Sequence, residues 1–179
     1  MTPQIGQGSV YWITGLSGAG KSTLAQALHV QLQAAGQPTV IVDGDAVRAL
    51  LLSDASMDRG SRLRIAEFNG RLCRFLAMQG LHVVCATISL FHSVQAWNRA
   101  HLPNYTEICL TTPLEFLIER DPNGLYARAR AGEIQHVVGL DIVPEWPTAP
   151  DFVFTTEHHP SPTAMAETIL SNLGKADHR

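Results

Sequence analysis

Nine consecutive residues near the start of the chain have the types and spacing that hold nucleotide phosphates. They are Gly15, Leu16, Ser17, Gly18, Ala19, Gly20, Lys21, Ser22 and Thr23, between a β-rich run and a helical pattern. Glycines here let backbone N–H groups turn toward phosphate oxygens, and the following helix directs its positive end at them. We expect Lys21 to reach the outer phosphates of ATP and the Ser22 hydroxyl to ligate Mg²⁺. The sequence therefore predicts an ATP-binding P-loop.

Two carboxylates lie one residue apart at the end of the second apolar run. They belong to Asp43-Gly44-Asp45, and ligands of parallel sheets bind at this carboxyl edge, beside the P-loop. One acid suits a place near Mg²⁺ or its waters, and the other suits accepting a proton from an attacking hydroxyl. A simpler interpretation is that Asp45 caps the helix that follows. Capping and catalysis are compatible, and we expect both.

Two other classes of P-loop protein lack support in the sequence. A guanine-specific switch needs an Asn-Lys-x-Asp element, but the only lysines are Lys21 and Lys175. A transporter ATPase carries a Ser-Gly-Gly-Gln signature, which is absent. The remaining prediction is an ATP-dependent phosphotransferase.

The elements that position these residues alternate along the chain. Apolar or β-rich runs predict strands at residues 9–14, 38–42, 81–88, 105–110 and 151–155. Helical patterns predict helices at residues 22–35, 46–52, 61–79, 113–120 and 162–173. Such alternation predicts a single α/β domain over residues 1–179, a P-loop NTPase-type parallel sheet covered by helices on both faces.

Residues 121–150 break this alternation. The segment is rich in Arg, Gly and Pro and contains a short helical stretch but no good strand. A long insertion of this kind is more often a mobile lid over an active site than a passive loop. We therefore predict an Arg-rich lid, with Arg128 and Arg130 able to close over the phosphates.

Composition narrows the partners. The formal charge of −3 argues against a surface that tracks nucleic-acid phosphates. The chain has 11 Arg and 2 Lys, and the planar guanidinium fork suits binding of phosphate or sulfate. The three cysteines lack a disulfide or zinc pattern, and neither a signal peptide nor a membrane-spanning run is present. We expect a cytoplasmic enzyme that contacts neither membrane nor nucleic acid.

Several motifs resemble the adenylyl-sulfate kinase family. They lie at residues 12–23 (Trp-Ile-Thr-Gly-Leu-Ser-Gly-Ala-Gly-Lys-Ser-Thr), 43–48, 120–134, 139–141 and 144–147. The resemblance implies transfer of the γ-phosphate of ATP, with Mg²⁺, to the 3'-hydroxyl of a nucleotide that carries a 5'-phosphosulfate. It also implies a homodimer, and the apolar face of the predicted helix 61–79 is expected to be core or dimer surface.

Matching positions to the family implies residue roles. Asp45 would face the attacking hydroxyl, and Arg48 would bind the acceptor's anionic group. Ser89, at the end of the 81–88 strand, matches a family serine beside the acceptor. Arg128 and Arg130 match the lid.

A further acceptor arginine has two candidates. Counting without gaps from Asp45 to Gly80 assigns it to Arg62. The local pair Asp58-Arg59 resembles the family's Asp-Arg, which favours Arg59. Both remain candidates at this stage.

The acceptor pocket departs from the family pattern. Met57 and Val137 occupy the positions of two phenylalanines that sandwich the adenine of the acceptor, and Ile65 replaces an asparagine. Other family residues are also replaced, by Ala46, Leu90, His92 and Gln135. The phosphate-donor motifs are kept, whereas the acceptor pocket is altered.

Three functions therefore stay open. The first is phosphorylation of adenylyl sulfate. The second is the same chemistry on another nucleotide, such as the cytidine diphosphoramidate used by relatives in capsule modification. The third is a nucleotide-binding regulatory subunit without turnover, which the presence of Asp45, Arg48 and the lid motif disfavours.

Overall fold

The computed structural model describes residues 6–51, 58–121, 123–155 and 160–176. Within these residues five strands form one sheet in the order β2-β3-β1-β4-β5. The strands are β1 (Val10–Gly15), β2 (Thr39–Asp43), β3 (His82–Ala86), β4 (Tyr105–Leu110) and β5 (Phe152–Phe154). All neighbouring pairs are parallel, which confirms the predicted sheet.

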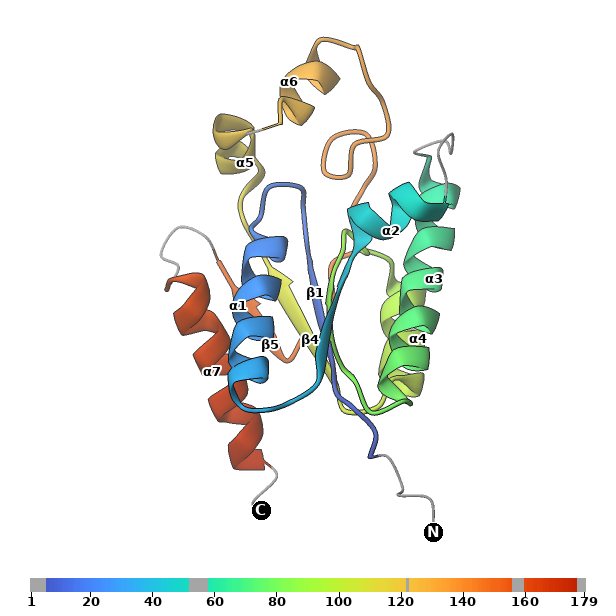
Figure 1. Ribbon diagram of the computed structural model, residues 1–179. Helices are drawn as coiled ribbons and strands as arrows, with labels where there is room; N and C mark the ends of the chain where they lie inside the picture. Colours follow the sequence, from blue (N-terminus) through green and yellow to red (C-terminus); the bar gives the residue numbers. More distant parts are fainter. Residues whose placement is uncertain (1–5, 52–57, 122, 156–159, 177–179) are drawn as a thin grey trace.

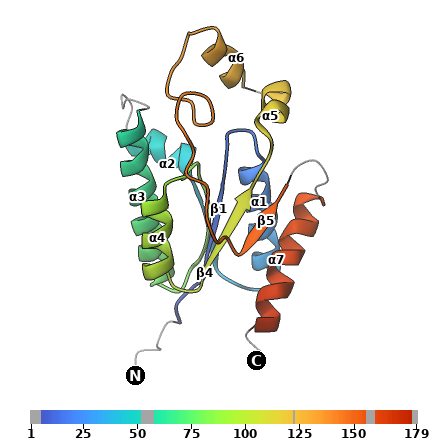
Figure 2. The same ribbon diagram turned by 180° about the vertical axis from the view of Figure 1, so that it is seen from behind.

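Helices cover both faces of the sheet (Figures 1 and 2). Helices α1 (Lys21–Ala34) and α7 (Pro162–Ala176) pack together on one face. Helices α3 (Arg59–Ala77) and α4 (His92–His101) pack together on the other. Because parallel strands need crossover connections, a helix separates each strand from the next.

The central strand β1 divides the core into two clusters. Its side chains alternate between the faces, as those of a strand must. Tyr11 and Ile13 pack in the α1 and α7 cluster, with Leu24 and Leu28 among their neighbours. Val10 and Trp12 pack in the α3 and α4 cluster. Burial on both sides explains why residues 10–15 read as a continuous apolar run.

The remaining helices lie at the carboxyl end of the strands (Figure 1). They are α2 (Gly44–Leu51), α5 (Leu114–Arg120) and α6 (Leu125–Arg130). The last of these belongs to the predicted lid, where an isolated bridge between Val138 and Ile142 is the only strand-like pairing among the described residues. All five predicted strands and all five predicted helices are confirmed to within three residues at each end.

Helix α4 was missing from the prediction. Two of its three buried residues, Gln95 and Asn98, are polar, and only Val94 is apolar. No side chain caps its start at Phe91. The helix therefore lacks a capping residue and buries mostly polar side chains, so two of the signals by which an amphipathic helix is recognised are missing.

Two further findings concern membrane-spanning helices and cysteines. None of the described helices is long and apolar enough to cross a membrane. Cys73, Cys85 and Cys109 are free and buried, in agreement with the absence of a disulfide pattern in the sequence.

Candidate active site

The P-loop joins β1 to α1 at the carboxyl edge of the sheet. Gly18 and Gly20 have φ angles of 78° and 91°, in the left-handed region that glycine adopts without strain. Gly20 is the N-cap of α1, and no side chain caps the helix there. Because the first N–H groups of a helix lack partners within it, this end is suited to bind an anion.

Lys21 is the first residue of α1 and turns back across the loop. Its Nζ donates a hydrogen bond to the Leu16 carbonyl at 2.7 Å. Burial lowers the pKa of Lys21 from 10.5 to about 8, although the charges of Asp45 and Asp43 act in the opposite direction. Both carboxylates are thus close enough to stabilise the lysine cation. Bound phosphates would add to that stabilisation.

Asp43 links the P-loop to the next helix. Its Oδ2 accepts a hydrogen bond from the Ser22 hydroxyl at 2.9 Å. Its Oδ1 accepts the backbone N–H groups of Asp45 and Ala46 at 2.9 and 3.2 Å. The predicted cap at Asp45 is therefore wrong. Asp43 caps α2, because the helix starts at Gly44, two residues before the predicted start at Ala46.

The Ser22–Asp43 pair fits Mg²⁺. Hydroxyl and carboxylate oxygens are the ligands this ion prefers, and it commonly binds through few protein ligands together with water and phosphate. Among the described residues no cluster of three or more His, Cys, Asp or Glu forms a metal cage.

Gly44 allows β2 and β3 to end side by side. A Cβ atom built on it would lie 2.6 Å from Thr87 Oγ1 and 2.9 Å from Thr87 Cβ. Any side chain at residue 44 would push α2 away from the end of β3. The small residue between Asp43 and Asp45 therefore keeps both acids at the sheet edge.

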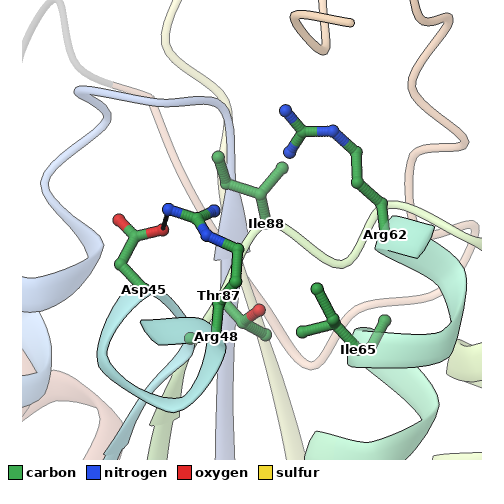
Figure 3. Close-up of a pocket in the computed structure, with 8 residues that line it drawn as sticks. Asp45, Arg48, Arg62, Ile65, Thr87 and Ile88 are labelled. Atoms are coloured by element: carbon green, nitrogen blue, oxygen red, sulfur yellow. Dashed lines mark ion pairs between the residues drawn. The ribbon is translucent and has the colours of Figure 1, made fainter. Parts of the chain in front are cut away.

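A hollow lies beside the P-loop between α2, α3 and the end of β3 (Figure 3). Its lining residues are Gly44, Asp45, Arg48, Arg62, Ile65, Ala66, Thr87 and Ile88. Within it, Arg48 Nη2 lies 3.0 Å from Asp45 Oδ1. Figure 3 shows Arg48 reaching in from α2 and Arg62 from α3, which brings one carboxylate and two guanidinium groups together.

Arg62 is held at the rim of this hollow by the lid. Its Nη2 donates a hydrogen bond to the backbone carbonyl of His136 at 2.7 Å. Burial, followed by the like charge of Arg48, lowers the pKa of Arg62, while Asp45 and Asp141 counter the shift. Two neighbouring guanidinium groups that repel each other favour an anion between them.

Arg59 has a different environment. It forms an ion pair with Glu145 in the lid and lies over the Phe91 ring, 5.3 Å from the centroid. Glu145 also accepts the His92 backbone N–H at 2.7 Å, and its own carbonyl accepts a hydrogen bond from Gln95 Nε2 at 2.8 Å. The His92 N–H and then Arg59 lower the pKa of Glu145. Arg59 thus fixes the returning end of the lid and does not line the hollow.

Ser89, Val137, Arg128 and Arg130 are not among the residues that line the hollow. Met57 lies outside the described residues. Val137 is buried in the α1 and α7 cluster. Ser89 is fully buried, and its hydroxyl has no hydrogen-bond partner within the described part of the chain. Arg128 and Arg130 are exposed on α6, with Arg128 Nε 3.4 Å from Glu133.

Tyr126 is a site residue that the sequence prediction missed. It extends from α6, is only 2% exposed, and its hydroxyl donates to the Ser17 carbonyl of the P-loop at 3.0 Å. Burial, helped by the charge of Asp121, raises its pKa to about 12, so the hydroxyl keeps its proton. The only available signal was one aromatic residue in an otherwise Ala- and Arg-rich helix, which does not specify a partner 109 residues away.

Known proteins resemble the chain over nearly its whole length. The family model for adenylylsulphate kinase matches residues 7–155. An adenylyl-sulfate kinase of Deinococcus deserti is 42% identical, over 95% of this chain and 93% of that protein. A cytidine diphosphoramidate kinase of Campylobacter jejuni is 36% identical, over 92% and 95%.

A solved structure agrees. The Mycobacterium tuberculosis APS kinase in complex with AMPPNP and APS superposes with a TM-score of 0.86 at 31% identity, over 94% of this chain and 99% of that one. Together with the P-loop and the carboxylate and arginine residues beside it, these matches show that the chain belongs to the adenylylsulphate kinase family.

Proposed function

We propose that the protein transfers the γ-phosphate of ATP to the 3'-hydroxyl of adenylyl sulfate. The observation that carries this proposal is the position of Asp45. Its carboxylate pairs with Arg48 in the hollow, and its charge also acts on Lys21 of the P-loop. One carboxylate thus lies between a phosphate-donor site and an anion-binding site, as phosphoryl transfer to a hydroxyl requires. The Deinococcus and Mycobacterium relatives support the choice of acceptor.

The residues take complementary roles in the proposed reaction. Asp45 accepts the proton of the acceptor's 3'-hydroxyl while the hydroxyl oxygen bonds to the γ-phosphorus. The bond from that phosphorus to the β–γ bridging oxygen breaks, which leaves ADP. Lys21 and the N–H groups at the start of α1 stabilise the charge on the phosphates. Mg²⁺, held through Ser22 and Asp43, would neutralise phosphate charge when bound.

We assign the acceptor's anionic group to Arg48 and Arg62. Both line the hollow, whereas Arg59 is engaged by Glu145. This favours Arg62, the candidate from gapless counting, as the acceptor arginine. Arg62→Ala should raise the KM for the acceptor far more than Arg59→Ala, which should act through the lid on both substrates.

A second acceptor is favoured by one feature of the hollow. Ile65 lines it where the family has asparagine, so an amide that could bond to a base or ribose is replaced by an apolar side chain. The cytidine diphosphoramidate kinase of Campylobacter, which is 36% identical to this chain, is named for a different nucleotide. Cytidine diphosphoramidate is therefore the alternative acceptor.

Steady-state ADP formation separates these functions. The kcat/KM is measured for adenylyl sulfate and for cytidine diphosphoramidate in wild type, Ile65→Asn and Ile65→Val. If adenylyl sulfate is the acceptor, it gives the higher kcat/KM in wild type. A preference for cytidine diphosphoramidate that Ile65→Asn reverses, and Ile65→Val keeps, supports the alternative. ATP hydrolysis that neither acceptor stimulates would leave the regulatory role.

We also propose that α3 carries a homodimer contact. Phe68 and Phe75 are 39% and 64% exposed on the outer side of α3, whereas Leu63, Leu72 and Leu76 pack against the core. Exposed aromatic side chains grouped on one helix favour association. Light scattering should give twice the chain mass for wild type and a lower mass for Phe75→Ser. The same mass for both would reject this surface.

A further inference from the structure

The residues 136–142 form a tight loop at the returning end of the lid, here called the 136–142 loop. The Asp141 carboxylate accepts the backbone N–H groups of both His136 and Val137. The Val137 carbonyl accepts the N–H groups of Leu140, Asp141 and Ile142 at 3.1 to 3.3 Å. Gly139 N–H closes the loop on the Ile142 carbonyl at 2.9 Å. This short segment is therefore fixed by its own hydrogen bonds.

The loop holds His136 in an unusual backbone conformation. His136 has a φ of 67°, in the left-handed region that residues other than glycine rarely adopt. Such a conformation costs free energy, so the surrounding contacts must maintain it. The Asp141 carboxylate does so directly, because it binds the N–H groups on either side of the His136 Cα and carbonyl.

The carbonyl fixed in this way is the one that binds Arg62. We propose that Asp141 is a positioning residue for acceptor binding: it fixes the His136 carbonyl, which in turn directs the Arg62 guanidinium into the hollow beside Asp45 and Arg48. The inference rests on the proposed function and adds to it a role for the Gly139-Leu140-Asp141 motif.

The charges explain why a carbonyl is suited to this task. A carboxylate bound directly to Arg62 would neutralise the cation that the acceptor's anion needs. A carbonyl orients the guanidinium and leaves its charge in place. Asp141 instead directs its charge to two N–H donors, which outweigh the effect of desolvation and lower its pKa.

The first test compares Asp141→Asn with a matched control. Asp141→Asn should raise the KM for the acceptor about tenfold, the effect of weakening one hydrogen bond to a charged group, with kcat and the KM for ATP unchanged. Glu67→Gln is the control, because it also removes one negative charge. Glu67 lies on α3, pairs with Arg71 at a distance of 3.6 Å, and does not line the hollow. An unchanged acceptor KM in folded Asp141→Asn overturns the inference.

A double-mutant cycle tests whether the effect passes through Arg62. In an Arg62→Ala background, Asp141→Asn should add little to the loss of acceptor binding. A full, additive loss would mean that Asp141 acts by another route and would overturn the inference.

Variants of His136 test the carbonyl itself and serve if Asp141→Asn does not fold. Both His136→Asn and His136→Val lack the imidazole, but asparagine tolerates a positive φ and valine does not. We expect a near-native acceptor KM for His136→Asn and an increase of about tenfold for His136→Val. Equal values for the two variants contradict the proposal.

A spectroscopic measurement separates this inference from the proposed function. The Arg62 side-chain N–H signal, assigned by its loss in Arg62→Ala, should shift in Asp141→Asn and not in Glu67→Gln. No turnover of wild type with either nucleotide rejects the proposed function, whereas an unshifted Arg62 signal rejects only the positioning role.

Discussion

The donor and acceptor ends of the proposed site are built in different ways. The donor end is nine consecutive residues between β1 and α1, and its geometry comes from local glycines and a helix start. The acceptor end combines residues of α2, α3 and the segment just after β3 with the His136 carbonyl of the lid, so its parts lie up to 92 residues apart in the sequence, from Gly44 to His136. A local loop binds the phosphates of ATP, the donor that is the same for every acceptor. A site assembled from distant segments can change with the acceptor.

The largest expected effect is at the donor end. Lys21→Ala should abolish phosphotransfer at every acceptor concentration, because it removes the cation that neutralises charge on the transferred phosphoryl group. The measurement is ADP formation with saturating ATP and acceptor, with thermal unfolding as a check on the fold. Native-like turnover in this variant would refute the P-loop assignment.

The next effect tests the carboxylate between the two ends. Asp45→Asn should lower kcat by roughly 10²- to 10⁴-fold, the usual contribution of a general base. Asp43→Asn provides the comparison, because Asp43 caps α2 and binds Ser22. It should cost about 1 kcal/mol of stability and change the Mg²⁺ dependence. If Asp45→Asn keeps its kcat, the base lies elsewhere.

The two ends also differed in how well the sequence predicted them. The sheet and the P-loop were predictable because apolar runs, glycines and helix patterns are local signals. Helix α4 was not, because Gln95 and Asn98 are buried where apolar residues are expected. The capping role of Asp43 depended on a helix start that lies two residues before the predicted one.

The acceptor end depended on contacts between distant segments. Arg59 and Arg62 could not be separated from the sequence, since both lie near the start of one helix and their partners, Glu145 and His136, are in the lid. Burial of Val137 also changes how the pocket can be probed. A phenylalanine at this position would overpack the core, so Ile65 is the cleaner position at which to test the acceptor.

A pH effect distinguishes the empty donor site from the filled one. With Lys21 at a pKa of about 8, against 10.5 when unfolded, the folded chain binds fewer protons between these values. Without nucleotide, stability should therefore rise with pH across this window. Phosphates raise the pKa of Lys21, so ATP binding takes up a proton, and affinity should fall by up to about tenfold per pH unit above 8.

Calorimetric titrations in buffers of different ionisation enthalpy would measure that proton. Competitive acetylation read by mass spectrometry measures the protonation of Lys21 directly. Lys175, the only other lysine of the sequence, serves as the internal reference. In the empty protein, Lys21 should lose its reactivity as the pH falls through about 8, because the amine becomes protonated. With ATP bound, the same loss should occur at a higher pH. Proton-independent binding between pH 8 and 10.5 would contradict the lowered pKa.

The smallest expected effect concerns the contact that joins the lid to the donor loop. Tyr126→Phe keeps the buried ring but removes the hydroxyl that donates to the Ser17 carbonyl. Loss of one neutral hydrogen bond should raise the KM for ATP about threefold to tenfold. The acceptor KM should change less, because the acceptor end is fixed to the lid through His136 and not through Tyr126. Tyr105→Phe is the matched control, since it removes a hydroxyl bonded to Glu107 at the opposite, amino end of β4. If both variants raise the KM for ATP equally, or if Tyr126→Phe changes only the KM for the acceptor, α6 does not couple the lid to the phosphate-binding loop.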